Sequence, residues 1–484
     1  MKKVNILLNV IIFIFIANNI IAQNETDALR YSFLMQGGTT RYMSMGSAFG
    51  ALGADISVVS SNPAGLAIYR SSEFTCSPSF YFDKVSASFQ DSKFDDFNYN
   101  LNLNNIGIVL AFTSDKTDGW VSTAFGFNYN RYNNYGMNFY VEGINDTNSI
   151  TDYFAQMAYG HTEDDLNPFA EELAYQGYLI DPDSSGTVYQ SSYDNYGEKQ
   201  EYLFTSKGYL GEYNFSYAGN YANKLYIGAS FGIQSIQYIQ RIDLQEKDIN
   251  KVITDFNSLD YYQYLKTTGT GYNFKFGMLF RPLDWARIGL AIHTPTFMTL
   301  HDNYYSTLTT SFEDNQKSYS GSSPDGIYDY GLLTPFRTMG SLAFIVKKQA
   351  LISFEAGMVD YTLSRLRASD YSFVNENSAI EKNYTTAYNF RSGLEYRFDI
   401  FNFRAGFGYY GSPYNSNNIN KDAYTLVYSG GIGIRENGYF FSIGYLIAQT
   451  SFSYYMYDQN IISSAPINAQ RNSSQLMFTF GFKF

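Results

Sequence analysis

Few side chains in this chain have the types and spacing that enzyme chemistry needs. Its three histidines, His161, His293 and His301, stand far apart, and none forms a metal-ligand pair at a useful spacing. Cys76 is the lone cysteine, so it supports neither an intramolecular disulfide framework nor a cysteine metal site. No nucleophile elbow occurs. The sequence therefore predicts no enzyme, no resident metal and no cofactor.

The carboxylates are the chemically richest group. Residues Tyr132–Ser206 hold thirteen acidic residues and one basic residue, Lys199, and their balance equals the net charge of −12 of the whole chain. Hard oxygen ligands at Glu163-Asp164-Asp165 could hold a divalent cation, but their spacing matches no EF-hand loop. A charge run is usually a solvated surface. We therefore interpret this segment as a polar loop.

Composition indicates what must position these residues. Residues 1–22 have a basic start, a short apolar core and a small residue, Ala22, at the end, which is typical of a secretory signal peptide. No later stretch reaches the ~18 apolar residues of a membrane helix. The chain has 47 Tyr and 41 Phe, a load that the aromatic girdles of a membrane barrel would use. Any membrane crossing after Ala22 must therefore use strands.

The last seven residues, Phe478–Phe484, place phenylalanine at every second position. A period of two puts the rings on one face of a strand, where lipid can cover them while the other face lines a wet lumen. Many segments from Glu73 onward alternate in the same way, and we expect the last strand to pair with the first, near Phe74–Phe82. A soluble β-propeller or sandwich is the competing architecture, but it would not combine these features with a secretory start.

Connections of two lengths give the strand number. Six short turns alternate with seven long polar connections, which predicts a 14-stranded antiparallel transmembrane β-barrel, an all-β fold. Its first strand would start from the periplasm and its last strand would return the C-terminus there. The expected short turns are 114–119, 222–224, 282–286, 347–350, 399–400 and 436–438. The expected outer loops are about 83–103, 132–206, 241–262, 301–328, 364–383, 412–422 and 458–470.

Residues 23–72 do not alternate like strands and precede the barrel, which spans 73–484. A barrel this wide needs a plug, so we expect this segment to fold inward as a hatch. Asn62-Pro63 predicts a turn, since the residue before proline avoids helical geometry. The segment carries Arg41, Met45-Gly46-Ser47-Ala48, Ala51-Leu52, Asp55 and Asn62-Pro63-Ala64-Gly65-Leu66. These residues either stabilise the plug or contact a ligand.

This block resembles the signature of the outer-membrane long-chain fatty acid transporters and their hydrocarbon-uptake relatives. The resemblance covers Arg41–Leu66, with Gly53-Ala54-Asp55 departing from a common Ala-Asp-Asp form. It implies a 14-stranded barrel with an N-terminal hatch, which agrees with the count above. It also raises a haem role known for some relatives, with His293 as the candidate ligand; an inward His293 that forms hydrogen bonds in the lumen is the simpler interpretation.

The resemblance further implies a groove between outer helices and a kink in the third strand. Two short helices are expected in the long loop, and the residues that would line the groove are Phe154, Met157, Phe169, Leu173 and Leu179. Alternatively, these residues only pack the loop onto the barrel rim. Gly126 lies in the expected third strand, Trp120–Asn130, and a glycine there suits a bend.

We therefore expect an outer-membrane, multi-pass channel that takes up hydrophobic small molecules, such as long-chain fatty acids or aromatic hydrocarbons, by passive diffusion with hatch rearrangement and lateral exit. The alternatives are a docking or shuttle component in protein secretion or surface attachment, and a surface adhesin. Expected partners are outer-membrane lipid and lipopolysaccharide and, through Phe484, the barrel-assembly machinery. We expect a monomer that binds no nucleic acid.

Overall fold

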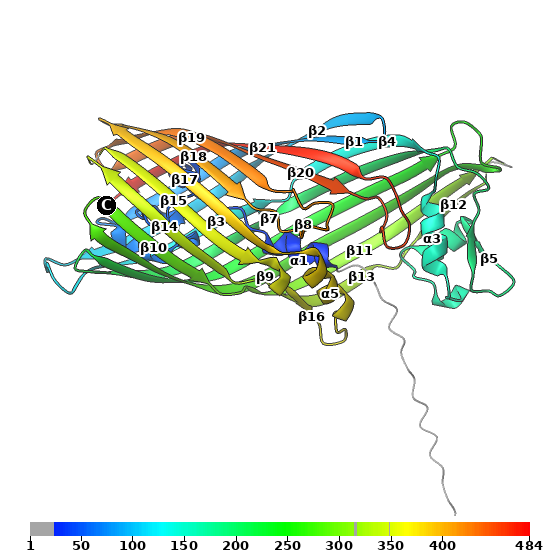
Figure 1. Cartoon of the computed structure of the whole chain (residues 1–484), viewed down its shortest axis with the longest axis horizontal. Coiled ribbons are helices and arrows are strands. Elements are labelled where there is room, and N and C mark those ends of the chain that lie inside the picture. Colours follow the sequence, from blue (N-terminus) through cyan, green and yellow to red (C-terminus); the bar gives the residue numbers. More distant parts are fainter. Residues whose placement is uncertain (1–23, 314–316, 348) are drawn as a thin grey trace, which may run out of the picture.

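The computed structural model describes residues 24–313, 317–347 and 349–484, and the predicted signal peptide, residues 1–22, lies outside them. Its main feature is a closed antiparallel barrel (Figure 1). The last strand pairs with the first, with Phe74 opposite Phe482 and Cys76 opposite Phe480, so the barrel has no free edge there. Tracing the pairings around the wall gives fourteen strands, which confirms the predicted fold.

Six of these strands, some with extensions, make up the first half of the wall. They are β1 (Glu73–Phe89), β2 (Ser92–Thr113), β3 (Trp120–Asn134) with its extension β4 (Met137–Asn145), β7 (Glu198–Tyr221), β8 (Leu225–Lys247) and β9 (Phe256–Leu283). The seventh is divided by Pro295 into β10 (Ala286–His293) and β11 (Phe297–Phe312). Proline lacks the backbone donor that a ladder needs, so the division is expected on chemical grounds.

The second half continues with an eighth strand divided into β12 (Ser318–Ser322), β13 (Gly326–Leu333) and β14 (Arg337–Val346). The remaining strands are β15 (Ala350–Asp360), β17 (Thr386–Phe398), β18 (Phe401–Tyr410), β19 (Thr425–Glu436), β20 (Tyr439–Tyr454) and β21 (Ile467–Lys483). Smaller strands are β5 (Ile180–Pro182), β6 (Tyr189–Ser191) and β16 (Arg365–Arg367). The helices are α1 (Glu25–Ser32), α2 (Thr40–Ser44), α3 (Ile150–Ala158), α4 (Glu171–Gln176) and α5 (Val374–Asn383), with single 3₁₀ turns η1 (Ile56–Ser60), η2 (Pro63–Ile68), η3 (Glu163–Asp165) and η5 (Tyr361–Leu363).

Side chains alternate across the wall as the sequence predicts. Phe480, Phe482 and Phe484 are exposed on the outside, whereas Thr479 is buried inside. The rings of Phe74 and Phe482 lie 5.5 Å apart across the closing pair of strands. Exposed aromatic and aliphatic residues continue around the other strands, which gives the wall the apolar outer face that lipid requires.

The predicted connections agree with the structure at one end of the barrel and differ from it at the other. Each predicted short turn joins two paired strands. At the outer end, however, strands are longer than expected. Residues 83–103 form no loop, because β1 and β2 pair as far as Phe89 and Ser92 and turn at Gln90-Asp91. Likewise β4 and β7 occupy much of 132–206, so the long loop is confined to residues 146–197. Polar residues misled the prediction, since long outer strands of this barrel stand in water on one side.

Residues Asn24–Ser72, called the N-terminal segment below, lie within the barrel. Figure 1 shows α1 enclosed by the wall. The segment reaches the wall on several sides: α2 packs on β18, β19, β20 and β21, and η2 packs on β3, β7, β8 and β9. Most of its residues are buried. It therefore fills the end of the lumen near the short turns.

Candidate functional site

A cavity of about 490 Å³ opens at the outer end of the barrel, a volume within the range of ligand pockets. It lies among α1, α3 and the outer parts of the strands, and we call it the outer cavity. Its lining is rich in aromatic rings, including Phe139, Tyr202, Tyr238, Tyr261, Tyr304 and Tyr454. The tyrosine hydroxyls add polar points to an apolar surface.

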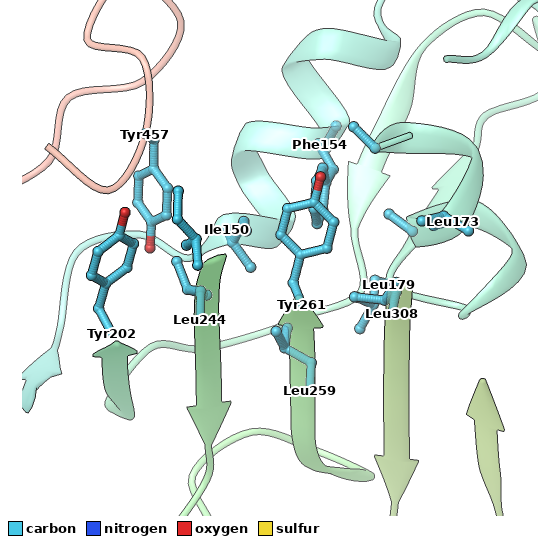
Figure 2. Packing of buried hydrophobic residues seen from close by; sticks show 14 of the residues in the cluster. Ile150, Phe154, Leu173, Leu179, Tyr202, Leu244, Leu259, Tyr261, Leu308 and Tyr457 are labelled. Atoms are coloured by element: carbon cyan, nitrogen blue, oxygen red, sulfur yellow. The ribbon is translucent and has the colours of Figure 1, made fainter. Parts of the chain in front are cut away.

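The residues predicted to form an outer groove divide into two groups. Phe154, Leu173 and Leu179 are buried in the cluster that seats α3 and α4 on the strand ends, as Figure 2 shows. Met157 and Phe169 are half-buried and line the outer cavity. The first three therefore pack the loop onto the rim, which was the alternative interpretation. Only Met157 and Phe169 remain as predicted substrate contacts.

A second cavity of about 380 Å³, called the inner cavity, lies deeper in the barrel. Its apolar lining comes mainly from the N-terminal segment with β19 and β20 and includes Leu29, Phe33, Met35, Met43, Val427 and Leu446. Its polar lining comes mainly from β2, β3 and β21 and includes Asn104, Arg131, Asn133, Asn134, Arg471 and Gln475. The two kinds of lining meet at β20 and β21, where Leu446 is paired with Gln475.

Helix α1 stands between the two cavities, since Thr26 and Arg30 line both. Its start is fixed by Asn24, whose side chain accepts hydrogen bonds from the first turn in a capping box with Asp27. Its end is held by Arg30, which pairs with Asp27 and lies 4.3 Å over the ring of Tyr238. Helix α1 therefore borders both cavities.

The wall beside the inner cavity lacks backbone pairing over part of its height. β2 pairs with β3 only between Asn105–Thr113 and Ser122–Asn130. Beyond these residues, β2 pairs with β1 and β4 pairs with β7, so no ladder joins β2 to β4 in the described part of the chain. We call this boundary the seam.

Side chains close the seam. The amide of Asn134 donates to Asn100 at 3.0 Å, and the backbone N–H of Tyr140 donates to Asp96 at 2.7 Å. The rings of Phe94 and Tyr140 meet edge to face, 5.1 Å apart. Together these contacts hold β2 to β4 less strongly than a continuous ladder would, because they are fewer than a ladder's regular hydrogen bonds. Opening the seam would therefore break no ladder hydrogen bonds between β2 and β4 in the described part of the chain.

The third strand bends at a different place from the one predicted. Gly126 pairs regularly with Val109 on one side and Ser216 on the other. A side chain there would press against Leu66 of the N-terminal segment, at 3.1 Å, so the glycine provides room inside the barrel. The register of β3 against β7 shifts between Trp120 and Ser122 and again between Arg131 and Asn133, the second shift lying at the base of the seam.

Ion pairs and backbone contacts anchor the N-terminal segment. Arg41 donates to Glu395 of β17 at 2.8 and 3.1 Å, and Arg404 of β18 donates to the same carboxylate at 2.7 Å. The N–H of Gly50 donates to Glu355 of β15 at 2.8 Å, and Arg391 also pairs with that carboxylate. Such buried charges are held because each has a partner of opposite sign.

The predicted hatch motif has a structural place in these contacts. Asn62 caps η2 by accepting from the N–H of Ala64 at 3.1 Å, and its amide donates to Gly50 and to Met278 of β9 at 2.7 and 3.1 Å. Asp55 caps η1 and accepts from Thr39 at 2.7 Å. The remaining motif residues Met45, Pro63, Ala64 and Gly65 are buried, and Gly46 packs on β18 and also borders the inner cavity. The motif thus fastens the segment within itself and to the wall.

The other candidate chemical groups lie at structural or exposed positions in the described part of the chain. His293 is buried, with its Nε2 2.9 Å from the carbonyl oxygen of Ser61, so it links β10 to the N-terminal segment. Among the described residues, no group of three or more His, Cys, Asp or Glu side chains could hold a metal ion. Glu163-Asp164-Asp165 form the exposed η3 turn.

No helix in the described ranges is both long and apolar enough to cross a membrane.

Several residues of the two cavities and the seam were not predicted from the sequence. Arg30, Arg131 and Arg471 carry no motif and come together only in the fold. A usable signal did exist for the seam, since Asn98, Asn100, Asn102 and Asn104 alternate along β2 with exposed Tyr99 and Leu101. A row of amides on the inner face indicates hydrogen bonding by side chains there.

Comparison with known proteins supports the fold. No family model and no curated protein matches the sequence. Among solved structures, a FadL homologue of Pseudomonas aeruginosa is similar with a TM-score of 0.60 and 13% identity, over 94% of this chain and 100% of that one. The toluene transporter TodX of Pseudomonas putida has a TM-score of 0.53 and 9% identity, over 93% and 99%. The chain therefore has the fold of these outer-membrane transporters.

Proposed function

We propose that this chain is an outer-membrane channel for hydrophobic small molecules, such as long-chain fatty acids or aromatic hydrocarbons, without covalent chemistry or an energy source of its own. A molecule first enters the aromatic outer cavity, passes α1 and occupies the inner cavity. It then leaves sideways through the seam into the membrane. The observation that carries this proposal is that two cavities meet at one short helix and the second ends at the unpaired part of the wall.

A sideways exit suits the geometry better than passage along the axis. The end of the lumen is filled by the N-terminal segment, which the Arg41–Glu395 ion pair helps to fasten to the wall. Crossing water beyond that segment would also raise the free energy of an apolar solute, by about 25 cal/mol for each Å² of apolar surface exposed. Two proteins that share this fold, a FadL homologue and the toluene transporter TodX, support the proposal of a channel for hydrophobic molecules.

Cross-linking the seam tests the proposal. In a Cys76→Ser background, Asn100→Cys and Asn134→Cys would be joined by a short thiol cross-linker in cells that lack other uptake proteins. We expect uptake of a labelled fatty acid and of labelled toluene to fall at least tenfold when the linker is added and to return when a cleavable linker is cut.

The matched control places the same two cysteines at Gln449 and Asn472, which also join by side chains at 3.0 Å but lie in regularly paired β20 and β21. Cross-linking there should leave uptake unchanged. If uptake is unchanged after the seam is cross-linked, the sideways exit is excluded. If the protein without cross-links takes up neither probe, a docking, shuttle or adhesion role becomes the better interpretation.

A further inference from the structure

The outer end of the wall carries a sheet edge that is largely unpaired in the described part of the chain. Strands β12 and β13 follow one another along β11 and pair with it on one side. On the other side only Gly331–Leu333 of β13 pair, with β16. Ser318–Ser322 and Gly326–Tyr330 have no strand on that side among the described residues, and we call these two stretches the open edge. Figure 1 shows β12 at the end of the barrel that carries α3.

Antiparallel pairing decides which backbone groups point into the open edge, because residues alternate between bonding to the partner strand and pointing away from it. The N–H of Ser323 donates to Ser306 at 2.9 Å, which fixes the alternation along β12. The N–H of Thr334 donates to Thr296 at 3.1 Å, which fixes it along β13. The residues whose N–H and C=O groups therefore point away from β11 are Ser318, Ser320, Ser322, Ile327 and Asp329. All of them are exposed.

The open edge lacks the usual protection. Proteins blunt a free sheet edge with lysine, proline or a bulge, since unpaired backbone groups are a template for another strand. Strand β12 reads Ser-Tyr-Ser-Gly-Ser and has none of these features. The residues that point into the open edge line neither the outer nor the inner cavity. The path through the channel therefore does not account for this edge.

Strand β16 shows what such an edge accepts. Arg365–Arg367 pair antiparallel with Gly331–Leu333, so an extended segment already adds a strand to β13 at its end nearer β14. The next positions along the same line, beside Ile327 and Asp329 and then beside β12, are unpaired in the described part of the chain. A strand placed there would satisfy the free backbone groups and continue the sheet.

We propose that the open edge binds an extended segment of another protein outside the cell, which pairs with β12 and β13 as an added strand. Main-chain hydrogen bonds give such a contact its affinity, and side chains at alternate positions give it specificity. Tyr319 lies on the inward face, opposite buried Thr310, and its ring lies 4.5 Å from that of Tyr178, which is 52% exposed. The segment therefore has apolar side chains at every second position, against the two tyrosines, and polar ones between them.

A second copy of this chain does not fit the open edge. The strands of such barrels tilt by about 35–45° from the membrane normal. Two copies in one membrane are related by a rotation about that normal, so open edges that face each other would cross at about twice the tilt. Neighbouring strands of a sheet are instead rotated by only about 20–25°. The partner is therefore a different polypeptide.

Binding of a fluorescent peptide to the purified full-length barrel in nanodiscs tests the inference. The probe alternates valine and threonine and carries a lysine at each end for solubility. Ser320→Pro removes an N–H of the open edge but no bond to β11, and proline is tolerated at such edge positions. We expect Ser320→Pro to weaken binding about tenfold, since one hydrogen bond is lost and the ring obstructs the added strand. Ser320→Ala, which keeps the N–H, is the matched control and should bind the peptide as the unaltered protein does.

Hydrogen exchange in the unaltered protein avoids dependence on a folded variant. Without peptide, the amides of Ser320 and Ile327 should exchange quickly, whereas that of Gly321, which points to β11, should exchange slowly. Saturating peptide should slow exchange at Ser320 and Ile327 and leave Gly321 unchanged. This pattern distinguishes an added strand from peptide that binds elsewhere on the barrel.

Equal peptide binding by Ser320→Pro and Ser320→Ala, or unchanged exchange at Ser320 with saturating peptide, would overturn the inference. A dimer that Ser320→Pro abolishes, in a barrel that binds no peptide, would assign the open edge to a second copy and would overturn it as well. Either result leaves the proposed channel intact, because the residues that point into the open edge lie outside both cavities.

Discussion

The contacts that close the two ends of this barrel differ in kind. At the end near the short turns, Arg41 of the N-terminal segment pairs with Glu395 of the wall, a carboxylate that Arg404 of β18 also binds. At the outer end, α3 and α4 are seated on the strands by apolar packing around Phe154, Leu173 and Leu179 (Figure 2).

Both ends also use the other kind of contact: Phe49 and Leu66 pack against the wall at the inner end, and the N–H of Ile150 donates to Glu246 at the outer end. Ile150 belongs to the long loop with α3 and α4, residues 146–197, which we call the cap.

The difference has a consequence for movement. Separating a buried ion pair costs several kcal/mol of free energy, about 3–5, because the remaining charge stays desolvated without a partner. Apolar packing weakens gradually with the area exposed. The N-terminal segment beyond α1 should therefore stay in place as a unit, while the cap can loosen locally. The following variants test this contrast, from the largest expected effect to the smallest.

Removal of the carboxylate at the inner end should have the largest effect. Glu395→Ala leaves Arg41 and Arg404 without their anion, and breaking such a buried pair destabilises by about 3–5 kcal/mol. We expect the N-terminal segment to detach part of the time, which would appear as large conductance steps in planar bilayers. Asp95→Ala, which breaks the exposed Lys84–Asp95 pair, is the control and should give unchanged conductance. Silent bilayers with Glu395→Ala would show that the ion pairs do not hold the plug.

Truncation in the cap should act locally. Leu173→Ala removes a buried side chain of α4 and should destabilise the cap by about 3 kcal/mol. Limited proteolysis should then cut residues 146–197 faster while the barrel stays heat-resistant and its conductance stays low. Leu363→Ala, at an exposed site elsewhere, should leave the cutting rate unchanged. A conductance change in Leu173→Ala would contradict the separation of cap and plug.

The cap should also respond to pH through Glu198, at the outer end of β7. Burial and the neighbouring Glu246 raise the pKa of Glu198 from 4.5 to about 9. The closed cap therefore holds this proton more tightly than the open one, so closure weakens as pH rises from about 4.5 to about 9, by up to about 1.4 kcal/mol per pH unit. Glu198→Gln should reduce this dependence, while the buried Glu246, whose pKa burial also raises, keeps part of it.

The measurement compares proteolysis of residues 146–197 at pH 6 and pH 8.5, each normalised to an unfolded substrate. We expect Glu198→Gln to protect the cap more at pH 8.5 than at pH 6. Glu201→Gln, on the same strand but paired with Lys199 and Lys247, should not reproduce this protection. An equal effect of Glu198→Gln at both pH values would show that Glu198 is ionised in the closed cap.

The smallest effect on the finished fold is expected at the last residue. Phe484 is exposed, and its N–H donates to the carbonyl of Ser72 at 3.0 Å. Deleting it should change thermal stability little, since an exposed ring contributes little packing. We propose that deleting Phe484 lowers the amount of assembled barrel, because the barrel-assembly machinery recognises this terminal residue. Normal assembly with Phe484 deleted would contradict this role.

The inner end was easier to predict than the outer end for a physical reason. Lipid on one side and the lumen on the other impose a strict period of two, as at Phe480 and Phe482. Above the lipid, both faces of a strand can be polar, so β1 and β2 beyond Phe82 looked like a loop. The prediction of groove residues met a similar ambiguity: an apolar helix face predicts burial at Phe154 and Leu173, but does not say whether a ligand or the rim covers it.

The barrel, its fourteen strands and the closure of the last strand on the first could be predicted from the residues alone, because lipid makes alternation and turn spacing, which are local properties, obligatory. The folded chain was needed to show where the wall is unpaired, which side chains close it, and that three arginines from α1, β3 and β21 share one cavity. These features depend on strand register and on how the N-terminal segment crosses the lumen. Both are set by contacts between residues hundreds of positions apart, such as Thr40 and Thr479.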